Sequence, residues 1–147
     1  GDAIVAVQLP NGPGLPLLHL ALNRIGLLMM PMSDGYRELE LAHLLKQGEV
    51  AAAIVPSTLR GHDYPAMWDA MRRDIPSLLH VLPMDDVSEL LRQPTLAATD
   101  RLDARRSGPD AIAHIMLSSG TTSLPKISVF TSNNLLAMVD AFASMVA

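Results

Sequence analysis

The chain carries the stretch Ser118-Ser119-Gly120-Thr121-Thr122-Ser123-Leu124-Pro125-Lys126 between two apolar runs, Ile112–Leu117 and Ile127–Phe130. The stretch gathers five hydroxyl side chains around one glycine and ends in a lysine. A glycine lets the backbone turn its N–H groups toward a ligand. Hydroxyls donate hydrogen bonds, and a lysine supplies a positive charge. A loop of this composition between two strands is suited to binding a polyanion.

Apolar runs of strand length alternate with segments of helical spacing along the rest of the chain. We expect strands at Ile4–Leu9, Leu27–Met32, Ala51–Val55, Leu78–Leu82, Ile112–Leu117 and Ile127–Thr131. We expect helices at Leu17–Ile25, Glu38–Gln47 and Tyr64–Asp74, a short one from Asp85 or Asp86 to Arg92, and a last one from Asn133 or Asn134 to Val146. The stretches Ser57–Asp63 and Gln93–Asp110 are expected to be loops. This order predicts an α/β fold with a parallel sheet flanked by helices on both faces.

Ligands of such sheets bind at the carboxyl ends of the strands. The hydroxyl-rich stretch follows the strand that ends at Leu117, so we expect it at that edge of the sheet. The candidate binding residues are therefore Ser118, Ser119, Gly120, Thr121, Thr122, Ser123 and Lys126.

Composition excludes several classes of function. The chain has 147 residues, the length of one domain, with 49% hydrophobic and 18% charged residues, enough for a buried core. A net charge of -4 and 3% aromatic residues do not indicate a nucleic-acid partner. The absence of cysteine excludes disulfides and a thiol nucleophile and fits a cytoplasmic protein. The five histidines lack metal-ligand spacing, and no apolar run reaches the roughly 20 residues of a membrane span.

The spacing from Gly120 to Lys126 is that of a Walker A loop, but the rest of that motif is missing. Pro125 replaces its second glycine, and Ile127 replaces its magnesium-binding hydroxyl residue. A strand follows the loop in place of a helix, so no helix N-terminus is available for phosphate. The stretch does not indicate a Walker-type NTPase.

The stretch resembles the phosphate loop of adenylate-forming enzymes, usually [ST]-S-G-[ST]-T-G-x-P-K-G followed by a strand and a T-H-x-N-like segment. Residues 118–122 and Pro125-Lys126 match this motif, and Thr131-Ser132-Asn133-Asn134 is similar to the segment after it. Ser123 and Ile127 stand where the family usually has glycine, and Ser132 stands where histidine is common. The resemblance extends over nearly the whole chain through Gly1–Asn11, Ala21–Gly26, Met30-Pro31-Met32, Arg37–Leu41 and Arg60–Tyr64.

The resemblance implies that this chain is part of the large N-terminal domain of an ATP-dependent acid–CoA ligase. Such enzymes join a carboxylic acid to ATP, with Mg²⁺, and most pass the acyl group to coenzyme A. By resemblance, Thr121 and Thr122 contact the β- and γ-phosphates, while Ser118, Ser119 and Gly120 shape the cradle and Ser123 belongs to the same loop. Lys126 neutralises charge on the departing pyrophosphate and is the expected catalytic residue.

The family's adenine motif, ribose-binding aspartate and catalytic C-terminal lysine have no counterpart in residues 1–147. We therefore expect an inactive N-terminal portion without the C-terminal domain, whose exposed apolar surface favours self-association. Two alternatives remain open: a truncated or degenerate adenylation-like module that binds without catalysis, and a flavodoxin-like regulator without adenylating ancestry.

Overall fold

The computed structural model describes residues 3–85, 104–105, 107–118 and 124–146. Its strands are β1 Ile4–Val7, β2 Leu28–Pro31, β3 Ala52–Val55, β4 Thr58–Leu59, β5 His62–Asp63, β6 His80–Pro83, β7 Ile112–Ser118 and β8 Lys126–Thr131. Its helices are α1 Gly14–Arg24, α2 Glu38–Gln47, α3 Tyr64–Met71, the 3-10 turn Arg72–Asp74 and α6 Ser132–Val146. The short helix expected up to Arg92 and most of the loop expected up to Asp110 lie outside the described residues.

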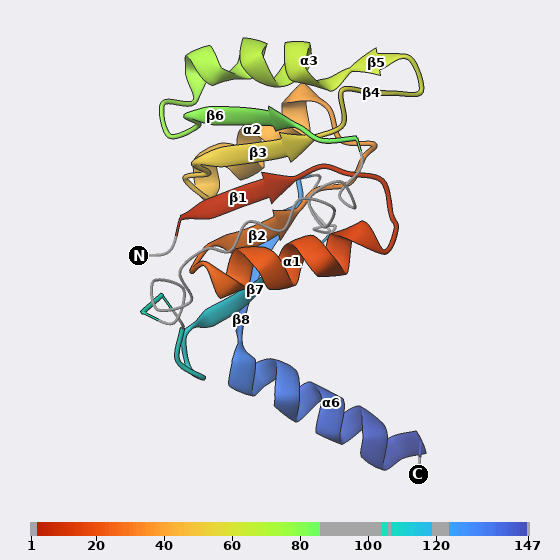
Figure 1. Ribbon diagram of the computed structural model, residues 1–147, viewed down its shortest axis with the longest axis vertical. Helices are drawn as coiled ribbons and strands as arrows, with labels where there is room; N and C mark the ends of the chain where they lie inside the picture. Colours follow the sequence, from red (N-terminus) through yellow and green to blue (C-terminus); the bar gives the residue numbers. More distant parts are fainter. Residues whose placement is uncertain (1–2, 86–103, 106, 119–123, 147) are drawn as a thin grey trace.

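A parallel sheet of four strands in the order β2-β1-β3-β6 forms the body of the molecule (Figure 1). Side chains alternate between its two faces, as the two-residue period of a strand requires. Val5 and Val7 pack with α1 on one face, while Ala6 packs with α2 and α3 on the other. The predicted α/β fold with a parallel sheet between helices is therefore confirmed.

Helix α1 begins three residues earlier than predicted, at Gly14 in place of Leu17. The prediction rested on the helical spacing of the apolar residues, which begins at Leu17. In the structure Pro16 lies in the first helical turn, where the backbone N–H groups have no partner within the helix anyway.

The segment expected as a loop between Ser57 and Asp63 contains a short antiparallel ribbon. Strands β4 and β5 pair Thr58 with Asp63, and the turn between them has positive φ at Arg60 (52°) and Gly61 (76°). Two successive positive φ angles are typical of a type I′ hairpin turn. An arginine is uncommon in the left-handed region, so the sequence gives little sign of this ribbon.

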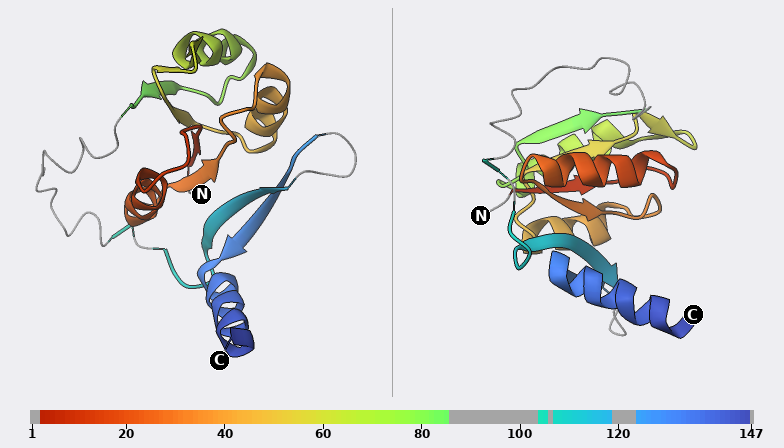
Figure 2. Two further views of the ribbon diagram at one scale, coloured as in Figure 1. Left: turned by 90° about the vertical axis from the view of Figure 1, so that its right-hand side faces the viewer. Right: turned by 60° about the horizontal axis from the view of Figure 1, so that its bottom comes forward.

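Strands β7 and β8 correct the expectation of a purely parallel arrangement. They form a separate antiparallel hairpin, in which Ile115 pairs with Val129 and Ser118 with Lys126. A parallel crossover needs a dozen or more residues and usually a helix, and the stretch 118–126 supplies neither. The hairpin lies beside the edge strand β2, and α6 extends from its far end (Figure 2).

The buried side chain of Gln8 ties the end of β1 to two other parts of the fold. Its Oε1 accepts a hydrogen bond from Trp68 Nε1 of α3 at 2.8 Å. Its Nε2 donates to the backbone carbonyls of Ser33 at 2.9 Å and Tyr36 at 3.0 Å. Gln8 is 0% exposed, so these bonds replace the ones that water would make.

We predict that Gln8→Leu lowers the free energy of unfolding by roughly 2–4 kcal/mol, because it leaves the Trp68 N–H buried without a partner and removes the bonds to the Ser33 and Tyr36 carbonyls. Urea unfolding followed by circular dichroism measures the change. The matched control is Gln47→Leu at an exposed position of α2, which should alter stability by no more than about 0.5 kcal/mol. Equal losses in the two variants would contradict the role of the Gln8 network.

Candidate functional site

Two of the seven predicted binding residues are described, and they lie opposite each other. Ser118 ends β7, Lys126 begins β8, and the hairpin register pairs them directly. Both are exposed. The other five, Ser119, Gly120, Thr121, Thr122 and Ser123, lie outside the described residues. The described ends of the loop therefore bring one hydroxyl and one cation together at the tip of the hairpin.

The hairpin is held to the body by apolar packing on one face. Ile115 is 1% exposed and belongs to the core shared with α2 and α3, and Leu117 and Ile127 pack against that core. The Ile127 Cδ1 atom would lie at an ordinary contact distance of 3.5 Å from a Cβ built on Gly48, just after α2, whereas Met30 Cε would lie only 2.6 Å away, so the glycine leaves room for Met30. These contacts fix the strands that carry the loop.

Ile127 is one of the two loop positions that depart from the resembled motif. Among the described residues, the non-glycine residues with positive φ are Glu49 and Arg60, so Ile127 has an ordinary backbone conformation. Its side chain is used for packing against the body. The isoleucine therefore carries no backbone strain and contributes to docking of the hairpin.

A polar cluster of His19, Asn23 and His114 joins α1 to β7. Asn23 Nδ2 donates to the Ala113 carbonyl at 3.1 Å and lies 3.2 Å from His19 Nε2. The rings of His19 and His114 meet edge to face with centroids 4.9 Å apart. Burial lowers the pKa of His19, and the neighbouring His114 lowers it further. Burial also lowers the pKa of His114.

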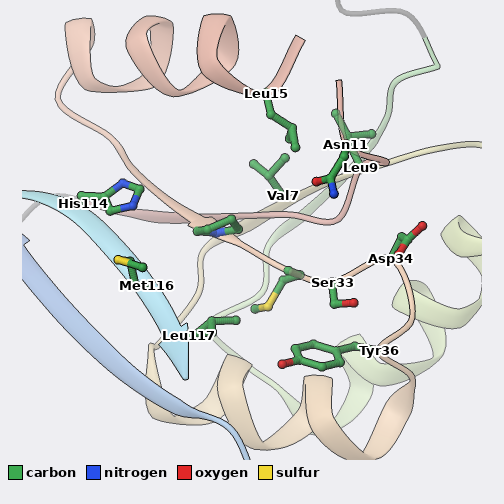
Figure 3. A pocket seen from close by; sticks show the side chains of 12 residues that line it. Val7, Leu9, Asn11, Leu15, Ser33, Asp34, Tyr36, His114, Met116 and Leu117 are labelled. Atoms are coloured by element: carbon green, nitrogen blue, oxygen red, sulfur yellow. The ribbon is translucent and has the colours of Figure 1, made fainter. Parts of the chain in front are cut away.

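A pocket of about 420 Å³ lies between the carboxyl ends of β1 and β2 and the strand β7 (Figure 3). Apolar side chains from β1, α1, β2 and β7 form much of its wall. Its polar lining comes from Asn11, Ser33, Asp34, Tyr36 and His114. Leu117, which precedes the first loop residue, also lines it, so the pocket adjoins the start of the predicted phosphate loop.

The far wall of this pocket is the segment 33–37, which several side chains hold in place. Tyr64 Oη donates to the Asp34 carbonyl at 2.8 Å, and Arg37 donates to the same carbonyl at 2.9 Å. The Asp34 carboxylate lies 3.7 Å from the exposed guanidinium of Arg60. Such a pocket suits a small molecule with an apolar body and a few hydrogen-bonding groups.

Sequence reasoning did not identify the polar residues of the pocket. They lie at separate places in the chain and come together only through the parallel register of β1 and β2 and the docking of β7. The sequence did indicate Asn11 and Ser33 through their position, because each follows an expected strand and ligands bind at the carboxyl ends of parallel strands.

The described residues show no group of three or more histidine, aspartate or glutamate side chains arranged for a metal ion. No helix within the described part of the chain has both the length and the apolar character needed to cross a membrane.

Comparison with known proteins assigns residues 1–146 to one family model, described as AMP-binding enzyme. A salicylyl-CoA synthase / salicylate adenylyltransferase of a Streptomyces species is 35% identical over 146 residues, which cover 91% of this chain and 26% of that protein. Triostin synthetase I of Streptomyces triostinicus is 33% identical over 123 residues, 84% of this chain and 22% of that protein. The chain thus spans about a quarter of the length of these curated relatives.

A solved structure of a fatty acyl CoA synthetase from Mycobacterium tuberculosis has the same arrangement of elements. The TM-score is 0.71 with 24% identical residues, over 97% of this chain and 27% of that chain. This likeness shows a shared fold.

We predict that Ile115→Ala destabilises the chain by about 2–5 kcal/mol, because it leaves a cavity where the hairpin docks. Val129→Ala is the matched control, since Val129 pairs with Ile115 across the hairpin but is 53% exposed. Urea unfolding followed by Trp68 fluorescence compares the two. A loss of less than about 1 kcal/mol in both variants would show that the hairpin does not depend on this anchor.

Proposed function

Because this chain belongs to the AMP-binding enzyme family, we propose that it is the N-terminal portion of a ligase that activates a carboxylic acid with ATP and transfers the acyl group to coenzyme A. The observation that carries the proposal is the pairing of Ser118 with Lys126 at the tip of a hairpin that adjoins a pocket at the carboxyl edge of the sheet. The relatives act on small carboxylic acids by name, among them salicylate and medium-chain fatty acids.

In the proposed reaction a carboxylate oxygen attacks the α-phosphorus of ATP, and the bond to the β-phosphate oxygen breaks. The products are an acyl-adenylate and pyrophosphate. Negative charge builds on the leaving pyrophosphate, so a fixed cation beside it lowers the barrier. We assign this role to Lys126 and assign contacts with the β- and γ-phosphates to Thr121 and Thr122. Ser118, Ser119, Gly120 and Ser123 complete the phosphate cradle.

In the second proposed step the sulfur of coenzyme A attacks the acyl carbon and AMP leaves, while the thiol proton passes to solvent. Mg²⁺ is proposed to travel with the phosphates of ATP, which supply most of its ligands in such sites. Within the described residues, Ser118 and Lys126 fit a polyphosphate by their chemistry, a hydroxyl donor beside a positive charge.

We further propose that residues 1–147 form only part of the catalytic unit, are inactive by themselves and self-associate. Exposed apolar side chains support this proposal, and they gather on the outward-pointing helix α6 (Figure 1). They include Leu136, Met138, Val139, Phe142, Met145 and Val146. A contiguous apolar surface of this kind usually contacts another protein surface.

We predict that Lys126→Ala slows acid-dependent ATP–pyrophosphate exchange by roughly 10- to 150-fold in a ligase that contains this chain. The range corresponds to losing one charged hydrogen bond worth about 1.5–3 kcal/mol. The control is Lys46→Ala at an exposed position of α2, which should leave the exchange rate unchanged. An unchanged rate in the Lys126 variant would remove this residue from the mechanism.

We also predict that the 147-residue chain forms dimers or larger species at high concentration, seen as a rising mass in size-exclusion chromatography with light scattering. The double variant Val139→Ser, Phe142→Ser should return it toward a monomer, since these side chains are 62% and 70% exposed on α6. Leu39→Ser is the control, because Leu39 is equally exposed but lies on α2. A wild-type monomer at every concentration would contradict self-association.

A further inference from the structure

The position of the hairpin on the body depends on the His19–Asn23–His114 cluster as well as on apolar packing. Strand β7 forms its ladder with β8, and among the described residues it forms none with β2. Rotation of the hairpin away from α1 therefore breaks no ladder of the parallel sheet. On the α1 side, the contacts that oppose this motion include the Asn23 bond to the Ala113 carbonyl and the contact between the two histidine rings.

The hydrogen bonds of the cluster fix where the proton of His19 lies. A carbonyl only accepts, so the Asn23 group that faces the Ala113 carbonyl is the donating Nδ2. The same Nδ2 faces His19 Nε2, which must then carry a lone pair. The single ring proton of His19 is therefore on Nδ1, a buried atom without a hydrogen-bond partner in the described structure.

A second proton on His19 is incompatible with this arrangement. It would bind at Nε2 and turn that atom into a donor that faces the donating Nδ2 of Asn23. Asn23 cannot reverse its amide without placing its oxygen against the Ala113 carbonyl. Protonation of His19 and the docked cluster therefore exclude each other, and a charge on His114 adds repulsion across the 4.9 Å between the rings.

Within the described ranges, the charged groups on the elements around the cluster do not compensate an imidazolium. Arg24 is the other ionisable residue of α1. Strands β1 and β2 contain no ionisable residue, and Lys126 lies at the far end of β8. Arg105 places its backbone carbonyl beside Gly26, just after α1. Before β7, Asp110 accepts a hydrogen bond from Asn133.

The carboxylate that shares a cavity with His114 is Asp34, on the opposite wall of the pocket (Figure 3). It lies 3.7 Å from Arg60. Among the described residues, no carboxylate hydrogen-bonds to or forms an ion pair with His19 or His114.

We propose that the His19–Asn23–His114 cluster is a proton-released clasp that positions the β7–β8 hairpin on helix α1. In mild acid the clasp opens and the hairpin leaves α1, while the four-stranded sheet stays folded. When the clasp opens, the phosphate loop moves with the hairpin. The importance of that movement for phosphate binding rests on the proposed function, but the clasp itself does not. The lowered pKa values agree with this direction, because docking then contributes fully above the usual histidine pKa of about 6.5 and is lost as the pH falls below it.

The test is hydrogen–deuterium exchange of the 147-residue chain at pH 7.5 and pH 5.5, with rates corrected for intrinsic exchange. Because a two-stranded hairpin is only marginally stable once undocked, we expect the protection of β7 and β8 amides to fall by about 10-fold if one histidine gains a proton on opening and by up to about 100-fold if both do. The protection of β1 and β3 amides should stay constant. Equal losses in the hairpin and the sheet would overturn the proposal.

Two variants test whether His19 is responsible for the loss of protection in acid. His19→Gln removes the titrating ring and keeps an amide oxygen that can accept from Asn23, so its acid loss of protection should be about 10-fold smaller than that of the wild-type chain. His43→Gln, on α2, is the control and should show the full wild-type loss. A wild-type acid loss in His19→Gln would overturn the proposal. Should that variant fail to fold, NMR titration of the wild-type ring decides, because a His19 pKa at or above about 6.5 is incompatible with the clasp.

Discussion

The side chain of Gln8 is the constraint from which the geometry of the pocket follows. Its amide has one acceptor and two donating hydrogens, and each is used by a different partner, Trp68, Ser33 and Tyr36. Because the group is fully buried, moving any partner leaves a polar atom without water to replace the bond. The end of β1, the segment 33–37 and helix α3 are thereby fixed relative to one another, and the first two of these form walls of the pocket.

The opposite wall of the pocket, formed by β7, is held in place mainly by side-chain packing. The hairpin strands β7 and β8 pair with each other, so side-chain packing by Ile115, Leu117 and Ile127 holds them to the body, together with the polar contacts of Asn23. Packing contacts of this kind give way at lower free energy than a hydrogen-bonded ladder in the centre of a sheet. The candidate site therefore lies between a wall locked by buried hydrogen bonds and a wall whose position depends on docking.

Much of the fold follows from the sequence because its signals are local. Short apolar runs predicted the strands β1, β2 and β3. Helical spacing followed by Gly48 predicted α2 at its observed bounds. The ribbon turn at Arg60 was not predictable, since its left-handed conformation is uncommon for arginine. The antiparallel hairpin was not predicted, although the stretch 118–126 is too short for a parallel crossover. The polar lining of the pocket had no local pattern, because Asn11, Asp34 and His114 meet only after β1, β2 and β7 are side by side.

The proposed phosphate loop lies at the tip of a hairpin and has no helix N-terminus beside it, unlike helix-capped phosphate loops. The next helix, α6, begins at Ser132, after the six residues of β8, so its N-terminus lies about 20 Å of strand away from Lys126. A helix dipole acts within about one turn of its end and does not reach the loop. Among the described residues of the hairpin tip, the positive charge is therefore that of Lys126. Since the energy of a charge pair falls inversely with distance, the proposed stabilisation of a polyphosphate depends on how closely the docked hairpin holds Lys126 to the bound phosphates.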